Sequence, residues 1–172
     1  MKNKTKRIIF GILILINCIT IFYFSHQVAD DSSKQSSRVV ELISNILPFI
    51  NNMEEPNKTI LKEQILTPIV RKTAHFSIYA MLGIFTTNFV LTLENKKTYK
   101  TIIFSLMFCF LYAVTDEIHQ RFIPGRYGAI TDVLIDTSGA LTGILITLAI
   151  TTIIRKIKNK NNLERNMLEN KN

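Results

Sequence analysis

The stretch TIIFSLMFCFLYAVTDEIHQRFIPGRYGAITDVLIDTSGALTGILITLAITTII, residues 101–154, places a charged connector between two apolar runs. The connector, Asp116–Arg126, contains acidic and basic side chains, and the second run carries Asp132 and Asp136. A carboxylate in hydrocarbon costs about 3 kcal/mol on insertion scales, so it persists where it faces a bundle interior or has a partner. We therefore expect these charges to mark a functional site.

Four segments approach the roughly 20 apolar residues that a helix needs to cross a bilayer. They cover about residues 8–24, 69–93, 101–120 and 130–154. The third is long enough only if its helix continues through Asp116 to Gln120, which places the carboxylates near the membrane surface. The sequence thus predicts an all-α integral membrane protein with a bundle of four transmembrane helices, in a single domain over residues 1–172.

The amino-terminal segment indicates the topology. Four basic residues precede its apolar run, which is longer than the core of a usual signal peptide, and Gln27 to Ala29 is a poor cleavage site. We therefore expect an uncleaved anchor. Most of the 21 Lys and Arg residues fall on the cytoplasmic side if both termini are inside. We predict a multi-pass protein of the cell membrane with cytoplasmic termini and a basic tail, 155–172, lying against anionic headgroups.

The outer loop, residues 27–67, contains two amphipathic stretches that we expect to be helical and to lie on the outer leaflet. In the first, apolar residues recur at helical spacing, with Ser32 or Ser33 available as a cap and Pro48 disturbing the end. These apolar residues are Val39, Ile43, Ile46 and Ile50. The second stretch spans residues 57–66, after which Thr67 and Pro68 read as N-cap and first position of the next helix.

Polar side chains recur at three- and four-residue spacing near the outer ends of three predicted helices, which puts each set on one helical face. The sets are Arg71, His75 and Tyr79; Tyr112, Asp116 and His119 or Gln120; and Asp132, Asp136, Gly139 or Ala140, and Gly143. Ser25, His26 and Gln27 end the first helix at the same level. We expect the four helices to line one outward-facing pocket, with Gly139 and Gly143 allowing close helix packing.

Two kinds of reactive chemistry are conceivable in this pocket. His75, Asp116, Glu117 and His119 are metal-ligand types, but Asp-x-x-His and Glu-x-His are weak spacings, so we predict no metal and no other cofactor. Carboxylates can also act as general acid or base, for which Asp132, Glu117 and Asp116 are candidates. No serine or threonine has the context of an activated nucleophile.

The charges could instead form a structural ion network that holds the helix ends together. Such networks are often neutral for stability relative to apolar replacements, which favours recognition of a charged ligand. Pro124-Gly125-Arg126 indicates a tight turn that aims the guanidinium over the pocket, and arginine suits phosphate or carboxylate. The predicted ligand-binding residues are Arg71, His75, Tyr79, Asp116, Glu117, His119, Gln120, Arg126, Asp132 and Asp136.

The net charge of +8 comes from basic residues that flank the membrane helices, a distribution that indicates membrane topology. The basic residues are not interleaved with aromatic residues, and no helix of the kind that reads bases accompanies them. Nucleic acid is therefore not an expected partner. Cys18 and Cys109 fall within apolar segments without zinc-ligand spacing, so we expect them to be packing residues.

Three motifs resemble the VanZ-like membrane protein family. They are Arg71-Lys72-x-Ala74-His75-Phe76-x-x-Tyr79, Asp116-Glu117-x-His119-Gln120-x-Phe122-x-Pro124-Gly125-Arg126 and Asp132-x-x-x-Asp136-x-x-Gly139-x-x-x-Gly143. The resemblance runs from Phe24 to Gly143 and implies four membrane helices and an envelope role. The family's named member lowers sensitivity to teicoplanin, and no reaction is implied. The family has asparagine as often as aspartate at position 136 and usually serine at position 26.

These observations lead to a working hypothesis: the pocket holds the anionic headgroup of a membrane lipid or lipid-linked wall precursor and so limits glycopeptide access. In the alternative, a membrane-embedded hydrolase or transferase acts on a lipid-linked envelope substrate. A third possibility is a structural partner of another envelope protein, for which the loop around Val39–Ile50 would matter more than the pocket.

Overall fold

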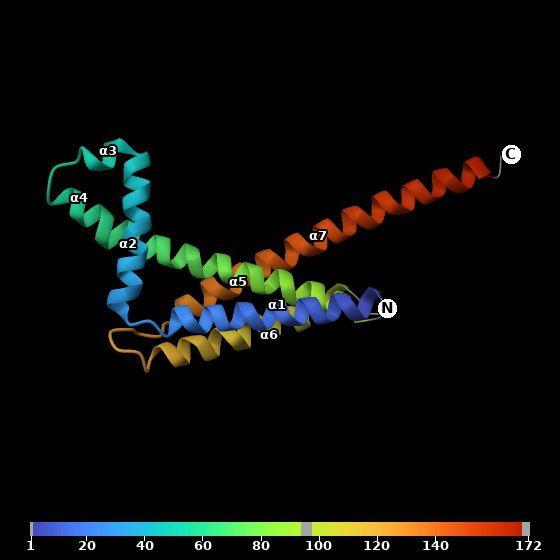
Figure 1. The fold of residues 1–172 in the computed structure, drawn as a ribbon, viewed down its shortest axis with the longest axis horizontal. Coiled ribbons are helices and arrows are strands. Elements are labelled where there is room, and N and C mark those ends of the chain that lie inside the picture. The colour runs from blue at the N-terminus through green and yellow to red at the C-terminus, as the bar shows by residue number, and fades with distance from the viewer. Residues whose placement is uncertain (1, 94–97, 170–172) are drawn as a thin grey trace.

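The computed structural model describes residues 2–93 and 98–169, and this part of the chain contains helices and no strand. Four long helices form a bundle (Figure 1): α1 (Lys2–Ser25), α5 (Thr67–Leu91), α6 (Thr98–Gln120) and α7 (Ile130–Glu169). The corresponding four segments are long and apolar enough to cross a membrane. The predicted four-helix membrane bundle is confirmed, and α6 continues to Gln120, as the length needed to span a membrane required.

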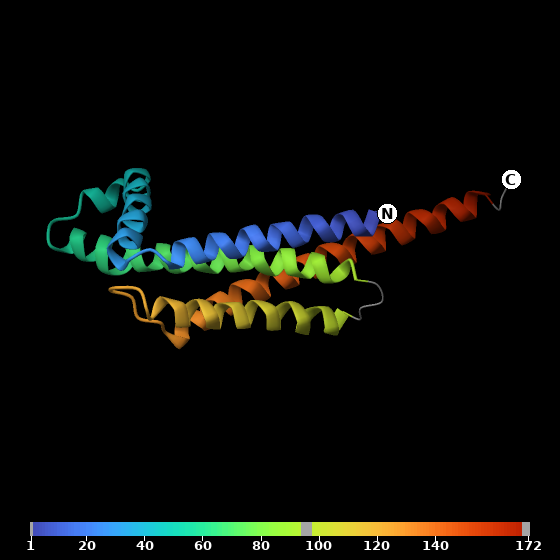
Figure 2. The same cartoon turned by 60° about the horizontal axis from the view of Figure 1, so that its bottom comes forward.

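Both termini lie at the same end of the bundle, and the segments that join α1 to α5 and α6 to α7 lie at the opposite end (Figures 1 and 2). We call this opposite end the α2 end. This arrangement agrees with the predicted topology, in which the two termini share one side of the membrane and these two connecting segments share the other. The predicted inner loop, Glu94–Lys100, lies mostly outside the described residues.

Two membrane helices are longer than the apolar segments that predicted them. α1 starts at Lys2, and α7 continues to Glu169, so the predicted basic tail is helical up to that residue. Residues 155–169 contain no glycine or proline and are rich in good helix formers. Lys160 and Glu164 also form an i,i+4 ion pair at 3.8 Å. Hydropathy marks where a helix can lie in lipid, whereas helical propensity continues beyond the apolar residues.

The outer segment is helical, as predicted, with different ends. It comprises α2 (Ala29–Ile46), α3 (Pro48–Asn51), α4 (Asn57–Thr59) and the π-helical η1 (Ile60–Leu66), which leads directly into α5. The predicted caps were wrong. Ser32 and Ser33 lie inside α2, whose N-cap is Val28. Thr67 lies within a continuous helical path, where its hydroxyl donates to Lys62 O instead of capping α5.

α2 crosses the α2 end of the bundle and packs against α5 (Figure 1). Its buried face is not the predicted apolar stripe, because Val39 and Ile46 are exposed and only Ile50, in α3, is fully buried. The buried residues of α2 are Ser32, Ser36, Val40 and Ser44. The Ser36 and Ser44 hydroxyls donate to carbonyls one turn earlier in α2. Small side chains whose hydroxyls are hydrogen-bonded within α2 thus make the contact with α5. The placement of α2 on the outer leaflet stays a prediction.

The bundle carries large apolar side chains on its exposed surface, as expected for helices that face lipid. On α1 the exposed set includes Ile8, Ile12, Leu15, Ile16 and Ile19. The core combines a few apolar side chains, such as Tyr79 and Leu82, with many small ones. A Cβ added to Gly139 or Gly143 would collide with the backbone of α5, at Phe76 and Ala80 respectively. The close helix packing predicted from these glycines is present, and the structure identifies α5 as the partner helix.

Candidate functional site

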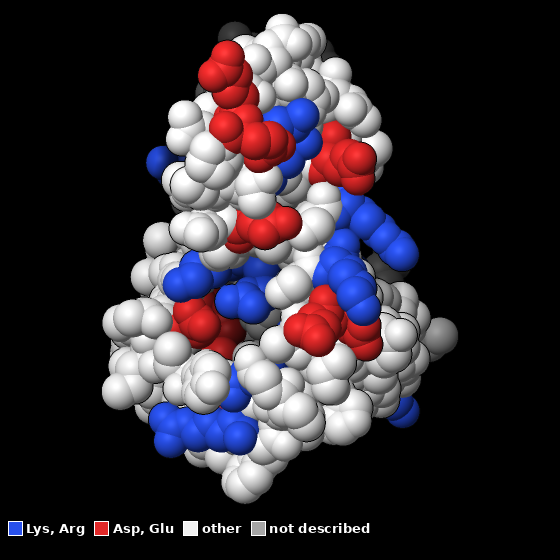
Figure 3. All heavy atoms as spheres, turned by 90° about the vertical axis from the view of Figure 1, so that its left-hand side faces the viewer, with Lys and Arg blue, Asp and Glu red and all other residues white. Residues whose placement is uncertain are grey.

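A polar cavity of about 140 Å³ opens at the α2 end of the bundle, between α5, α6, α7 and the segment 121–129. We call it the polar pocket. Its lining residues are Arg71, Lys72, His75, Glu117, Gln120, Gly125, Arg126, Tyr127, Asp132, Ile135 and Asp136. Figure 3 shows basic and acidic side chains gathered around a hollow on this end of the molecule. The three polar helix ends singled out in the sequence therefore meet at one cavity.

The set from α5 divides between the pocket and the core. Arg71 and His75 line the pocket, one helical turn apart. Tyr79, one turn further, is fully buried, and its ring lies 6.4 Å from that of Tyr112. Tyr112 in turn donates to Cys18 O of α1. Tyr79 and Tyr112 thus belong to the packed core beneath the pocket, and the structure does not place Tyr79 among the lining residues.

α6 divides its polar residues between α1 and the pocket. Asp116 Oδ2 accepts hydrogen bonds from Ser25 Oγ at 2.8 Å and from Gln120 Nε2 at 3.2 Å. His119 also faces α1, where its ring stacks on Phe22 and its Nε2 lies 3.3 Å from His26 Nδ1. His119 therefore serves the α1–α6 contact and does not line the pocket, which the helical spacing alone could not decide.

Glu117 fixes the segment that follows α6. Its Oε2 accepts a hydrogen bond of 2.9 Å from the backbone N–H of Ala129, immediately before α7. A Cβ at Gly128 would collide with the Glu117 carbonyl, so the segment runs tightly against α6 at this point. Glu117 therefore lines the pocket and also holds the segment 121–129, which forms one of its walls, against α6.

Arg126 reaches the pocket through a tight turn. The backbone N–H of Arg126 donates to Ile123 O at 3.1 Å. Pro124 and Gly125 are the central residues of this turn, and Gly125 has φ +75°. Proline followed by a residue with positive φ is the pattern of a type II turn, in which glycine is favoured. The turn predicted from Pro124-Gly125-Arg126 is therefore present, and the arginine that follows it lies on the pocket wall.

The Arg126 guanidinium is buried and has no ion-pair partner within the described residues. It donates to the carbonyls of Ser25 at 3.3 Å and Phe24 at 3.4 Å, and its Nε has no hydrogen-bond partner in the part of the chain that the structure describes. Burial, followed by the nearby Arg71 cation, lowers the pKa of Arg126. An arginine pKa starts above 12, so the group remains a cation at neutral pH. The pocket therefore contains a buried positive charge.

α7 supplies two aspartates with different partners. Asp132 Oδ1 forms an ion pair with Lys72 Nζ at 3.1 Å near the rim, where both side chains are partly exposed. Asp136 is fully buried and lies 3.6 Å from His75 Nδ1. Lys72 was part of a quoted motif but not of the predicted ligand set, because it does not share the helical face of Arg71 and His75. Tyr127 was also missed, since a loop residue has no helical periodicity to indicate its direction.

An apolar groove of about 210 Å³ adjoins the polar pocket between α1, α2 and α5. Its apolar lining includes Ile21 and Phe24 of α1, Val39 of α2, and Val70 and Ile78 of α5. Arg71, His75 and Arg126 line both cavities. A polar and an apolar cavity thus share three cationic or ionisable side chains.

The fold and the pocket define a multi-pass α-helical membrane protein with a charged site at one end of its bundle. The chain belongs to the VanZ/LLP1 family, whose sequence model matches residues 10–153. The family suspected from the three motifs is thereby confirmed. Searches among curated proteins and among solved structures gave no match.

Proposed function

We propose that the polar pocket binds the anionic headgroup of a membrane lipid or lipid-linked wall precursor at the outer face of the cell membrane. The observation that carries this proposal is Arg126, a buried cation that forms no ion pair within the described residues and is only partly compensated by the more distant Asp116 and Glu117 carboxylates. A buried charge without a close ion-pair partner is unfavourable. An anionic group beside Arg126 and Arg71 would compensate it, and a guanidinium matches the geometry of phosphate or carboxylate.

The adjoining apolar groove supports an amphiphilic ligand. Because Arg71 and Arg126 line both cavities, a headgroup at these arginines would lie where an attached acyl chain enters the groove between α1, α2 and α5. A free inorganic anion has no apolar part that could occupy this groove. The pairing of the two cavities therefore favours a lipid over a soluble anion.

The proposed orientation puts both termini in the cytoplasm, so that the α2 end faces outward, as the distribution of Lys and Arg indicates. Membership in the VanZ/LLP1 family supports an envelope role, because the named member of the VanZ-like family lowers sensitivity to teicoplanin. In our proposal the protein binds or alters an outer-leaflet lipid or wall precursor and thereby lowers sensitivity to teicoplanin-type glycopeptides.

Teicoplanin susceptibility of a sensitive Gram-positive host tests this role. The host carries the intact chain, Arg126→Ala, the matched loop variant Arg121→Ala or an empty vector, with membrane abundance measured for each. We expect reduced susceptibility from the intact chain and from Arg121→Ala, and its loss in Arg126→Ala. No effect of the intact chain would remove the resistance role, and an equal effect of all three chains would remove Arg126 from it.

The second candidate is a membrane-embedded hydrolase or transferase that acts on a lipid-linked substrate. It is favoured by the convergence of Glu117, Asp132 and Asp136 on the same cavity. In that case Asp132 or Glu117 would act as base, and purified protein would turn over a lipid carrying a phosphate or peptide group. Turnover that is lost in Asp132→Asn would support the enzyme, and no turnover across such a panel would count against it.

A further inference from the structure

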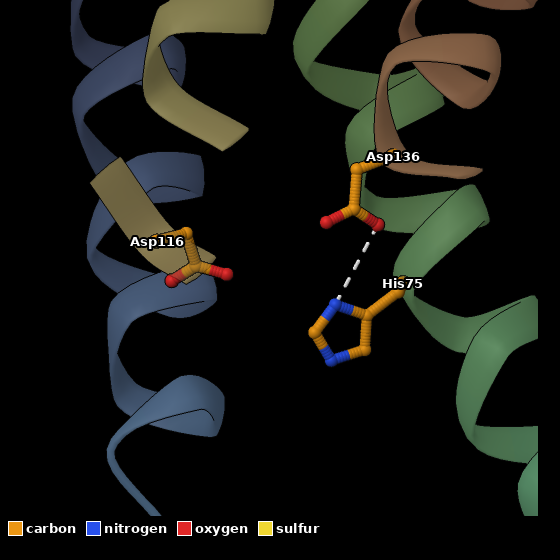
Figure 4. A group of neighbouring side chains, drawn as sticks. All are labelled: His75, Asp116 and Asp136. Atoms are coloured by element: carbon orange, nitrogen blue, oxygen red, sulfur yellow. Dashed lines mark ion pairs between the residues drawn. The ribbon is translucent and has the colours of Figure 1, made fainter. Parts of the chain in front are cut away.

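Three side chains from three helices converge behind the polar pocket: His75 of α5, Asp116 of α6 and Asp136 of α7. Each offers one ligand atom, and these atoms all lie within 4.8 Å of one another. Figure 4 shows His75 and Asp136 pointing toward each other, with Asp116 facing them from across the gap. We propose that His75, Asp116 and Asp136 bind a divalent transition-metal ion whose open coordination position faces the polar pocket.

Among the described residues, Asp136 lacks the partners that a buried carboxylate normally has. Its side chain is fully buried, and neither carboxylate oxygen accepts a hydrogen bond from the described residues. Buried carboxylates are normally paired, hydrogen-bonded or bound to a metal. The nearest ion-pairing group is His75 Nδ1 at 3.6 Å, which is too long for a hydrogen bond. Metal bonds of about 2.0–2.2 Å would place two tetrahedral ligands about 3.4 Å apart, so this separation suits two ligands of one ion.

Asp116 is held in place by neighbours that leave it able to bind a metal. Ser25 Oγ and Gln120 Nε2 both donate to Oδ2, and Gln120 Nε2 also lies 3.3 Å from Ser25 Oγ. Hydrogen bonds of this kind orient metal-binding carboxylates and commonly change metal affinity by about 10–100-fold when removed. Ser25 and Gln120 would therefore act as positioning residues for the ion.

The neighbouring acidic groups have other partners, which limits the ligand set. Glu117 binds the Ala129 N–H, and Asp132 forms an ion pair with Lys72. The sequence had suggested Glu117 and His119 as possible metal ligands, and the structure directs both elsewhere. Asp136, from the last helix, takes their place; the sequence had put it at the same pocket but not among the possible metal ligands.

The donor set indicates the kind of ion. One imidazole nitrogen and two carboxylate oxygens suit zinc, manganese or ferrous iron, whereas calcium and magnesium prefer oxygen ligands alone. Three protein ligands with a free position is the arrangement of catalytic zinc sites. His75 and Asp136 also line the polar pocket, so the free position would face the cavity that Arg126 borders. The site is independent of the proposed lipid, because it requires only the three side chains.

Metal content and affinity test the inference. The full chain is purified in detergent through a histidine-free affinity tag and without chelator, and metals are measured by mass spectrometry. Titrations then use Zn²⁺, Mn²⁺, Fe²⁺ under anaerobic conditions, and Mg²⁺ and Ca²⁺ for comparison. We expect one transition-metal ion per chain and a loss of affinity of about tenfold or more in His75→Ala and Asp136→Asn.

Matched variants distinguish metal binding at this site from nonspecific binding to other carboxylates or histidines of the protein. Asp132→Asn removes a carboxylate from the same pocket, and His119→Ala removes a histidine from the same end of the bundle; both should keep the metal. Ser25→Ala should weaken binding by about tenfold without abolishing it, as a positioning role requires. Equal metal binding by the intact chain, His75→Ala and Asp136→Asn would overturn the inference.

A measurement on the intact chain keeps the inference testable if variants fail to fold. Co²⁺ added to the intact protein should give visible absorption bands of a low-symmetry site with nitrogen and oxygen ligands, which one equivalent of Zn²⁺ should remove. A specific metal should also raise the unfolding temperature. Absence of the Co²⁺ bands together with no thermal shift from any of the three transition metals would refute the site.

Discussion

The Arg126 guanidinium lies against the carboxyl-terminal end of α1, with Nη1 3.3 Å from the carbonyl oxygen of Ser25. The last carbonyls of a helix have no partner within it and carry a partial negative charge of about half an electron. This contact offsets part of the arginine charge and fixes the guanidinium between α1 and the pocket. The remaining positive charge is available to a ligand, and the chain reaches this position only through the Pro124-Gly125 turn.

Enlarging Gly139 should disrupt the bundle, because a side chain there meets the α5 backbone at Phe76. Gly139→Leu is expected to destabilise the protein by at least about 1–3 kcal/mol, the usual cost of overpacking. Thermal unfolding in detergent measures the effect. Gly11→Ala is the control, since its added Cβ would make only an ordinary contact of 3.7 Å with Phe89. Equal unfolding temperatures for both variants would contradict the α5–α7 packing.

Removing the Glu117 carboxylate should loosen the wall of the pocket. Glu117→Ala leaves the Ala129 N–H without its acceptor, which costs about 1–3 kcal/mol when such a group stays buried. Hydrogen exchange should therefore become faster in residues 121–129. Glu117→Gln retains an acceptor oxygen and should exchange nearly as slowly as the intact chain. Unchanged exchange in Glu117→Ala would show that this hydrogen bond does not hold the segment.

The proposed orientation predicts which surfaces a membrane-impermeant thiol reagent can reach. With Cys18 and Cys109 replaced by alanine, a cysteine at the exposed position Lys34 of α2 should react in intact cells. A cysteine at Lys158, on the exposed part of α7, should react only after the cells are opened. The reverse pattern would place the polar pocket in the cytoplasm and exclude contact with outer-leaflet lipid.

Local patterns in the sequence predicted the parts of the structure that depend on local chemistry. Apolar run length gave the four membrane helices, and Pro124-Gly125 gave the turn before Arg126. The helical stripes correctly brought Arg71, His75 and Asp136 to one cavity. The ends of α1 and α7 were wrong because helical propensity continues beyond the apolar residues.

Contacts between helices could not be predicted, because they depend on how each helix is rotated about its axis. His119 and Gln120 are adjacent in sequence, yet one faces the rings of α1 and the other faces Asp116. Tyr79 shares the stripe of His75 but lies one turn deeper, in the core. In α2 the serine face packs and the apolar face is exposed, since small side chains permit the closer approach.

Lipid binding by the purified chain tests the central claim most directly. Native mass spectrometry would compare phosphatidylglycerol with phosphatidylcholine of the same acyl chains, for the intact protein, Arg126→Ala and Arg121→Ala. A hydrogen bond to a charged group contributes about 1.5–3 kcal/mol, which corresponds to roughly 10–100-fold in affinity. We predict that the intact chain and Arg121→Ala prefer the anionic lipid and that Arg126→Ala loses this preference by about that factor. Equal retention of both lipids by the intact chain, or an unchanged preference in Arg126→Ala, would contradict a headgroup site at Arg126.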